Sequence, residues 1–292
     1  MRRFMAIART AAIETMSQPL SAILFPVSVL AVHILPSLQY HRFGSPGRLA
    51  RETGLSALFV FGLLFAVPAA VRAIGRELET GTAAATLALG VSRTLYFAAR
   101  VSGVLAVFAL FFAGVLSAAL LSSFSCVKAS TIFVEHGVVR VWGPAFAVGV
   151  SGAVLSFAGG AFLNRFCGRR FCLWTCLLTV ALQLPGLAFL DGLSMLGAVL
   201  PASLSLFAAC TVHIVMAGAL ATRFKANGVS AAVVAAVLAG FLAPVGFIVP
   251  DMRVFWLEEG SSAALLPVAA GAALAAMWGV AGCISLETKE LE

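Results

Sequence analysis

Residues 72–100 read RAIGRELETGTAAATLALGVSRTLYFAAR, with four arginines and two glutamates in a chain of which only 11% is charged. Apolar runs border this stretch on both sides, at 54–71 and at 101–124. An α-helix needs about 20 apolar residues to cross a bilayer. We therefore predict that the stretch is a polar connection between two membrane-spanning helices.

Apolar runs of similar length recur along the whole chain. Hydrophobic residues make up 61% of the 292 residues and charged residues only 11%. A soluble globular chain carries roughly 25% charged residues. The runs are long and unbroken, unlike the short alternating strands of a membrane barrel. No connection is long enough for a separate soluble domain. The sequence predicts an all-α, polytopic transmembrane helix bundle with 1–292 as a single domain.

Eight runs have the length of a membrane span. They are approximately 20–38, 54–71, 101–124, 141–163, 171–190, 196–222, 229–249 and 263–286. If the fifth and sixth were re-entrant or interfacial, six spans would remain. Residues 2–18 are too polar to cross the bilayer, and we predict a helix lying in the interface there.

The orientation follows from the basic residues. An even number of spans puts both termini on one side, and the connections on that side hold about twice as many Arg and Lys residues as the others. Positive residues concentrate on the cytoplasmic side. Both termini and the 72–100 connection are therefore predicted to be cytoplasmic. The same bias accounts for the net charge of +7, so nucleic-acid binding is not indicated.

The sequence offers no site for ATP or a metal ion. A phosphate-binding loop of the G-x-x-x-x-G-K-[ST] type is absent, and the chain has three lysines, at 128, 225 and 289. The six cysteines form no C-x-x-C pair. Glu258 and Glu259 have no histidine nearby to complete a zinc site. We expect no catalytic residue, no metal and no cofactor on this chain.

An intramembrane serine hydrolase is one alternative. Gly149-Val150-Ser151-Gly152 has a form found in membrane-embedded serine proteases, and His213 in a later span is a candidate base. Ser151 lies in the middle of a span with no evident access to water. The segment after His213 also lacks the close-packing glycine of those enzymes. The structural alternative is that Ser151 is a small packing residue.

Polar groups inside the spans are few and costly in lipid. Gln183 and His213 are predicted to form helix–helix hydrogen bonds or, alternatively, to line a substrate path, and His33 is predicted to be interfacial. Gly152, Ser156 and Gly160 recur at four-residue spacing, which lets helices approach closely.

Local signals predict a short helix from Thr82 to Leu89. Thr80 or Thr82 is a candidate N-cap, the run after it favours helix, and Gly90 is a good terminator. Ser92 is the candidate cap of the next helix. The charges at Arg76, Glu77, Glu79 and Arg93 suit contacts with a partner; the alternative is a solvated loop whose arginines only set the orientation.

The run Arg76-Glu77-x-Glu79-x-Gly81-Thr82, followed by Leu87 and Ser92-Arg93, resembles the first cytoplasmic loop of permease subunits of type-2 ATP-binding-cassette (ABC) exporters. This chain has Gly90 where that family often has proline. The N-terminal helix resembles the family's elbow helix.

The resemblance implies a function as a transport subunit that is not itself an enzyme. Residues 72–100 would be the coupling loop, and a separate ABC ATPase subunit would bind ATP and magnesium. It also implies a homo- or heterodimer of permeases in the inner (plasma) membrane of a bacterium. A non-transporting membrane scaffold is a further alternative. The residues expected to contact the ATPase are Arg76, Glu77, Glu79, Gly81, Thr82, Leu87, Ser92 and Arg93.

Overall fold

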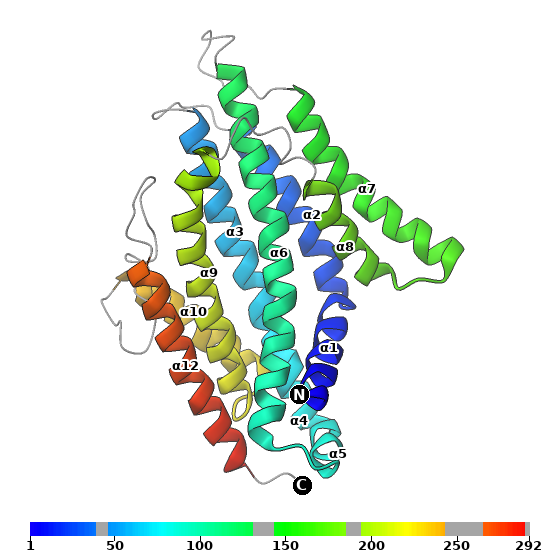
Figure 1. Ribbon diagram of the computed structural model, residues 1–292, viewed down its shortest axis with the longest axis vertical. Coiled ribbons are helices and arrows are strands. Elements are labelled where there is room, and N and C mark those ends of the chain that lie inside the picture. Colours follow the sequence, from blue (N-terminus) through cyan, green and yellow to red (C-terminus); the bar gives the residue numbers. More distant parts are fainter. Residues whose placement is uncertain (39–45, 131–142, 185–193, 243–264, 290–292) are drawn as a thin grey trace. The chain divides into compact units, whose positions relative to one another are not determined.

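The computed structural model describes residues 1–38, 46–130, 143–184, 194–242 and 265–289, and the described chain is helical with no strand (Figure 1). The prediction of an all-α fold is confirmed. The elements in order are α1 (Arg2–Met16), α2 (Pro19–Ile34), η1 (Leu35–Leu38), α3 (Pro46–Val71), η2 (Arg72–Arg76), α4 (Glu77–Glu79), α5 (Thr82–Ala88), α6 (Arg93–Ser130), α7 (Gly143–Cys167), α8 (Phe171–Gln183), α9 (Ser194–Ala221), α10 (Ala226–Leu242) and α12 (Leu265–Glu287).

Five of the described helices are long and apolar enough to cross a membrane, and α1 with α2 makes a sixth if this bent pair forms one span. The five are 47–79, 93–127, 143–167, 199–221 and 266–287. The first of them joins α3, η2 and α4, which follow one another without a break. The prediction of a multi-pass membrane protein is thereby supported by helix length and composition. The span count, eight or six, and the cytoplasmic termini stay predictions.

Two of the predicted spans correspond to shorter helices. α8 has 13 residues and α10 has 17. The remainders of the predicted spans 171–190 and 229–249 lie largely outside the described residues. A helix of 13 residues rises about 20 Å, less than the roughly 30 Å thickness of the hydrocarbon core.

The N-terminal segment is a helix, as predicted, and it ends at Met16. Pro19 occupies the first turn of α2, where proline is tolerated because the N–H has no intrahelical partner there. The interfacial position of α1 stays a prediction.

The residue contacts divide the chain into two compact units, which we describe separately. One unit comprises 1–15, 63–108 and 200–292, and the other comprises 16–62 and 109–199. The prediction of a single domain is not tested by this division. The first unit contains the 72–100 connection, and the second contains α7 and α8.

Glycines allow helices of the first unit to approach closely. A Cβ at Gly103 of α6 would overlap the carbonyl oxygen of Ala8 and lie 2.7 Å from Cβ of Ala11, both in α1. A Cβ at Gly282 of α12 would overlap the Phe97 ring. The beginning of α6 is thereby in direct contact with both α1 and α12.

In the second unit, α7 packs on α8 through the predicted small residues. A Cβ at Gly160 would overlap the hydroxyl of Thr175, and a Cβ at Gly152 would lie 2.8 Å from Nε2 of Gln183. The hydroxyl of Thr179 donates a 2.9 Å hydrogen bond to Oγ of Ser156. The interpretation of this spacing as close helix packing is confirmed.

Candidate functional site

The 72–100 connection folds as a short helix between two long ones. α5 runs from Thr82 to Ala88, within one residue of the prediction. Gly81 and Gly90 border it with φ values of 73° and 74°, a left-handed conformation that glycine adopts without steric cost. Ala83 is fully buried and fixes the inner face of the helix.

The predicted N-cap of α5 is wrong in detail. The N-cap position is Gly81, and no side chain caps it. The hydroxyl of Thr80 donates to the carbonyl oxygen of Arg76 at 2.9 Å, and that of Thr82 donates to the carbonyl oxygen of Glu77 at 3.3 Å. Both hydroxyls therefore bond to carbonyl oxygens of the turn before α5, and neither accepts from an N–H group of the first turn of α5. Ser92 does cap the following helix, because its Oγ accepts from the N–H of Leu95 at 3.3 Å.

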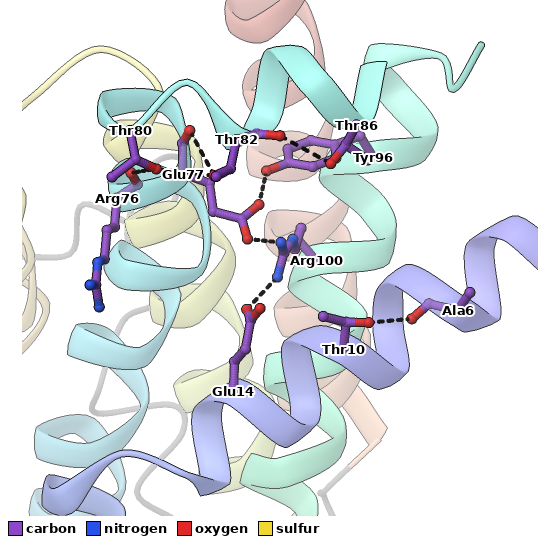
Figure 2. A network of polar contacts seen from close by, with 10 residues as sticks. All are labelled: Ala6, Thr10, Glu14, Arg76, Glu77, Thr80, Thr82, Thr86, Tyr96 and Arg100. Carbon is purple, nitrogen blue, oxygen red and sulfur yellow. Dashed lines mark hydrogen bonds and ion pairs between the residues drawn. The ribbon is translucent and has the colours of Figure 1, made fainter. Parts of the chain in front are cut away.

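A buried polar cluster lies behind α5, and Figure 2 shows its members pointing toward one another. The guanidinium of Arg100 on α6 pairs with the carboxylate of Glu77 on α4 and, at 2.6 Å, with that of Glu14 on α1. The hydroxyl of Tyr96 donates to the same Glu77 carboxylate. The side chains of Arg100 and Glu77 are only 6% and 15% exposed, whereas that of Glu14 is 51% exposed.

This cluster gives Glu77 an internal role. Sequence reasoning placed Glu77 among the residues facing a partner, but its carboxylate is occupied by Arg100 and Tyr96. Low dielectric strengthens such charge-assisted bonds and penalises any unpaired member. Glu77 therefore holds the base of α5 against α6, and α1 joins the same cluster through Glu14.

Arg93 is also used internally, at the C-terminal end of α12. Its Nη1 donates to the carbonyl oxygens of Leu286, Glu287 and Lys289 at 3.0, 2.8 and 2.7 Å. Thr94 adds a 2.7 Å bond to the Glu287 carboxylate. A helix C-terminus has unpaired carbonyls and a partial negative charge, both of which a guanidinium satisfies. Arg93 thus links the start of α6 to the end of α12.

The remaining predicted contact residues lie at the surface. Arg76, Glu79, Gly81, Thr82 and Ser92 are exposed, and Leu87 is half-buried. Figure 2 shows the Arg76 side chain pointing away from the cluster. Leu89, at the end of α5, is 74% exposed. An exposed face with one basic, one acidic and one large apolar side chain is suited to a protein partner.

α1 contacts the C-terminal part of the connection at two points. Besides the Glu14–Arg100 pair, Nη1 of Arg3 donates to the carbonyl oxygen of Gly90 at 2.9 Å. Sequence reasoning did not place Glu14, Tyr96 or Arg100 in the site. One available signal was the i, i+4 spacing of Tyr96 and Arg100, which puts both on one face of a largely apolar helix. In the structure the guanidinium carbon of Arg100 lies 5.7 Å from the centroid of the Tyr96 ring.

The second unit contains a separate polar contact around Gln183. Its Nε2 donates to the carbonyl oxygen of Gly149 at 3.0 Å, and its Oε1 lies 3.5 Å from Nε2 of His33. Gln183 and His33 are each 1% exposed. The helix–helix hydrogen bond predicted for Gln183 is confirmed. His33 is buried against it, and its predicted interfacial position in the membrane stays a prediction. Gly149 makes this possible, because a Cβ there would overlap the His33 ring.

The hydrolytic pairing of Ser151 with His213 stays an untested alternative. They belong to different compact units. Nδ1 of His213 lies 2.7 Å from the carbonyl oxygen of Ala209 in its own helix, and its Nε2 has no hydrogen-bond partner among the described residues. Ser151 is exposed and donates to Val148 in its own helix at 3.3 Å. The helix–helix bond predicted for His213 is not found in the described chain.

We expect Gln183→Leu to lower the free energy of unfolding by about 0.6–1.7 kcal/mol, the range for a hydrogen bond between membrane helices. Unfolding in mixed micelles, followed by circular dichroism, measures it. Ser151→Ala is the matched control and should change stability by less than about 0.5 kcal/mol. Equal effects of the two substitutions would contradict the structural role of Gln183.

An apolar groove of about 540 Å³ lies between α6 and α12, with Val215 of α9 at its wall. Phe97, Val101 and Val280 line it, and Thr94 and Glu287 form its polar end. A Cβ at Gly279 would meet Cγ1 of Val215 at 3.8 Å, an ordinary contact. The groove is lined by neither Gln183 nor His213, the two residues predicted as an alternative to line a substrate path.

No group of three or more potential metal-binding side chains occurs in the described ranges. The expected absence of a metal and of a cofactor stays a prediction. The chain matches no protein-family model, and searches of curated proteins and of solved structures found no similar protein. The function must therefore be argued from the site itself.

Proposed function

We propose that this chain is the membrane-spanning permease subunit of an ATP-driven ABC exporter in a bacterial inner membrane. A separate ATPase subunit would bind ATP and magnesium, and two permease subunits, identical or different, would form the pore. The observation that carries the proposal is α5. This seven-residue helix lies between two span-length helices, is bordered by left-handed glycines, and belongs to the run 76–93 that resembles a coupling loop.

The internal contacts of α5 give the proposed coupling a physical route. Closure of the ATPase subunits would push on α5. Its base is bound to α6 through Glu77 and Arg100, and α6 is bound to α12 through Arg93. Charge-assisted bonds between buried groups resist separation. A displacement of α5 would therefore move α1, α6 and α12 together, tilting the helices between inward- and outward-facing states.

The proposed ATPase contact uses the exposed residues of the connection. Arg76, Glu79 and Thr82 lie at the surface, and no ion pair of the described residues occupies the charges of Arg76 and Glu79. Gly81 contributes no side chain, which leaves the backbone at the start of α5 accessible. Glu77 and Arg93, also expected at this contact, hold α5 in place through their bonds within the chain.

The test is purification of the chain with its ATPase and measurement of ATP hydrolysis in nanodiscs. A Walker-motif ATPase should co-purify, and its hydrolysis rate should depend on the permease. Glu79→Lys should weaken assembly by about tenfold or more, because it replaces attraction by like-charge repulsion worth several kcal/mol at an interface. Glu77→Lys is a poorer probe, since it also disrupts the Arg100 cluster.

Glu52→Lys is the matched control, since Glu52 is half-exposed and pairs with Arg48 in α3 of the other unit. It should leave assembly unchanged. If Glu79→Lys behaves like the control, the exposed face of the 72–100 connection around Glu79 is not the ATPase contact. A partner that co-purifies without any effect of the permease on ATP hydrolysis would instead identify a non-transporting scaffold.

A further inference from the structure

The turn between α7 and α8 is an ordered structure that carries three arginines. α7 ends with Gly168 at φ 62°, and the N–H of Arg169 donates to the carbonyl oxygen of Leu163 at 3.1 Å. The bond reaches back six residues across a left-handed glycine, the residue type that commonly terminates a helix. Nδ2 of Asn164 donates to the carbonyl oxygen of Arg169 at 2.8 Å and closes the turn. Arg165 precedes Gly168, and Arg169 and Arg170 follow it.

Among the described residues of their own unit, no carboxylate pairs with the three guanidinium groups. Arg165, Arg169 and Arg170 are all exposed. Within the described residues of 16–62 and 109–199, the one carboxylate is that of Glu52, which pairs with Arg48 at 2.8 Å. The turn therefore presents an uncompensated charge of three over six residues, which attracts an anionic ligand.

Large aromatic side chains are exposed next to these charges. Phe162 and Phe166 are 57% and 72% exposed, and their ring centroids lie 4.7 Å apart. They continue the exposed apolar surface of α7, whose apolar window is only 28% buried. Apolar aromatic surface and arginine side by side at the end of an apolar helix fit the boundary between acyl chains and headgroups.

We propose that the turn formed by residues 164–170 binds the phosphate headgroup of an anionic phospholipid of the bilayer. The three guanidinium groups supply charge-assisted hydrogen bonds to phosphate oxygens, for which arginine has a suitable forked geometry. Phe162 and Phe166 contact the upper part of the acyl chains. The inference needs only a multi-pass membrane protein and is independent of the proposed transport function.

The experiment measures lipid binding by native mass spectrometry of the full chain titrated with phosphatidylglycerol or phosphatidylcholine. We expect the wild-type chain to retain phosphatidylglycerol preferentially. The triple change Arg165→Gln, Arg169→Gln and Arg170→Gln should weaken that binding by about tenfold to a hundredfold, given the contribution of each basic residue near an anionic surface. Replacing all three by lysine should retain a substantial part of the binding, because the charge is kept.

The control removes the same charge elsewhere, with Arg2, Arg9 and Arg72 replaced by glutamine. All three are exposed and belong to the other unit. This variant should change the tightest phosphatidylglycerol binding by less than about threefold. An equal loss in the control would show a general effect of net charge and overturn the site.

Three other results would also overturn the proposal. The first is equal retention of phosphatidylcholine. The second is displacement of phosphatidylglycerol by an equal concentration of inorganic phosphate, which would make the headgroup alone the ligand. The third is unchanged lipid binding in the glutamine variant together with loss of a protein partner, which would assign the turn to an acidic protein surface.

Discussion

Replacing Arg100 with alanine should lower the free energy of unfolding by about 3–5 kcal/mol, the cost of removing one partner from a buried ion pair. The substitution leaves Glu77 with a carboxylate that is 15% exposed and has lost its cation. The half-exposed Glu14 contributes less, because water screens its pair. Unfolding in mixed micelles measures the difference. We also expect faster proteolysis within 72–92, since α5 loses its anchor to α6.

A double substitution separates this effect from a general loss of packing. Arg100→Ala with Glu77→Ala removes both charges and should be more stable than Arg100→Ala alone, giving a coupling energy in the cycle of the two. Arg76→Ala is the matched control on the exposed side and should change stability by about 0.5 kcal/mol or less. Additive effects of Arg100→Ala and Glu77→Ala would refute the ion pair.

Gly103→Ala should destabilise the chain by about 1–3 kcal/mol, the usual cost of overfilling a packed interface. The added methyl group would overlap the carbonyl oxygen of Ala8 and approach Cβ of Ala11 to 2.7 Å. Backbone cannot rotate away as a side chain does, so α1 must shift from α6. The shift would also strain the Glu14–Arg100 pair. Thermal unfolding in detergent checks the stability.

Gly279→Ala is the control for the same chemical change inside a helix. Its new methyl group would meet Cγ1 of Val215 at 3.8 Å, and alanine favours the helix by up to about 1 kcal/mol over glycine. This variant should be as stable as the wild type or more stable. If both glycine substitutions raise stability, α1 does not pack closely on α6.

The helices and the short connecting helix were predictable because their signals are local. Run length and hydropathy predict a spanning helix, and Gly90 as terminator predicts the end of α5 within one residue. Ser92 was correctly predicted as a cap. The bonds of the Thr80 and Thr82 hydroxyls were not predictable from the sequence. Each hydroxyl can donate to a carbonyl oxygen of the preceding turn or accept from an N–H of the following helix, and the backbone geometry selects between them.

The internal roles of Glu77, Arg93 and His33 could not be predicted from the sequence. Arg100 and Glu14 are 86 residues apart, and Gln183 and His33 are 150 apart. No local pattern specifies which distant group a charge will meet. A charged residue in a loop was therefore assigned to a partner by default, although burial beside an opposite charge within the chain satisfies it equally well.

The bonds from Arg93 to the end of α12 set an order on the maturation of the chain. Arg93 and Leu286 are separated by 193 residues. During synthesis from the N-terminus, the Arg93 guanidinium lacks these three carbonyl partners until almost the whole of the described sequence has been made. The Glu14 and Glu77 contacts with Arg100 are available far earlier. The connection around α5 is thus half anchored in a nascent chain and becomes fully anchored only after α12 has been inserted, so a truncated chain would offer a looser surface to any partner.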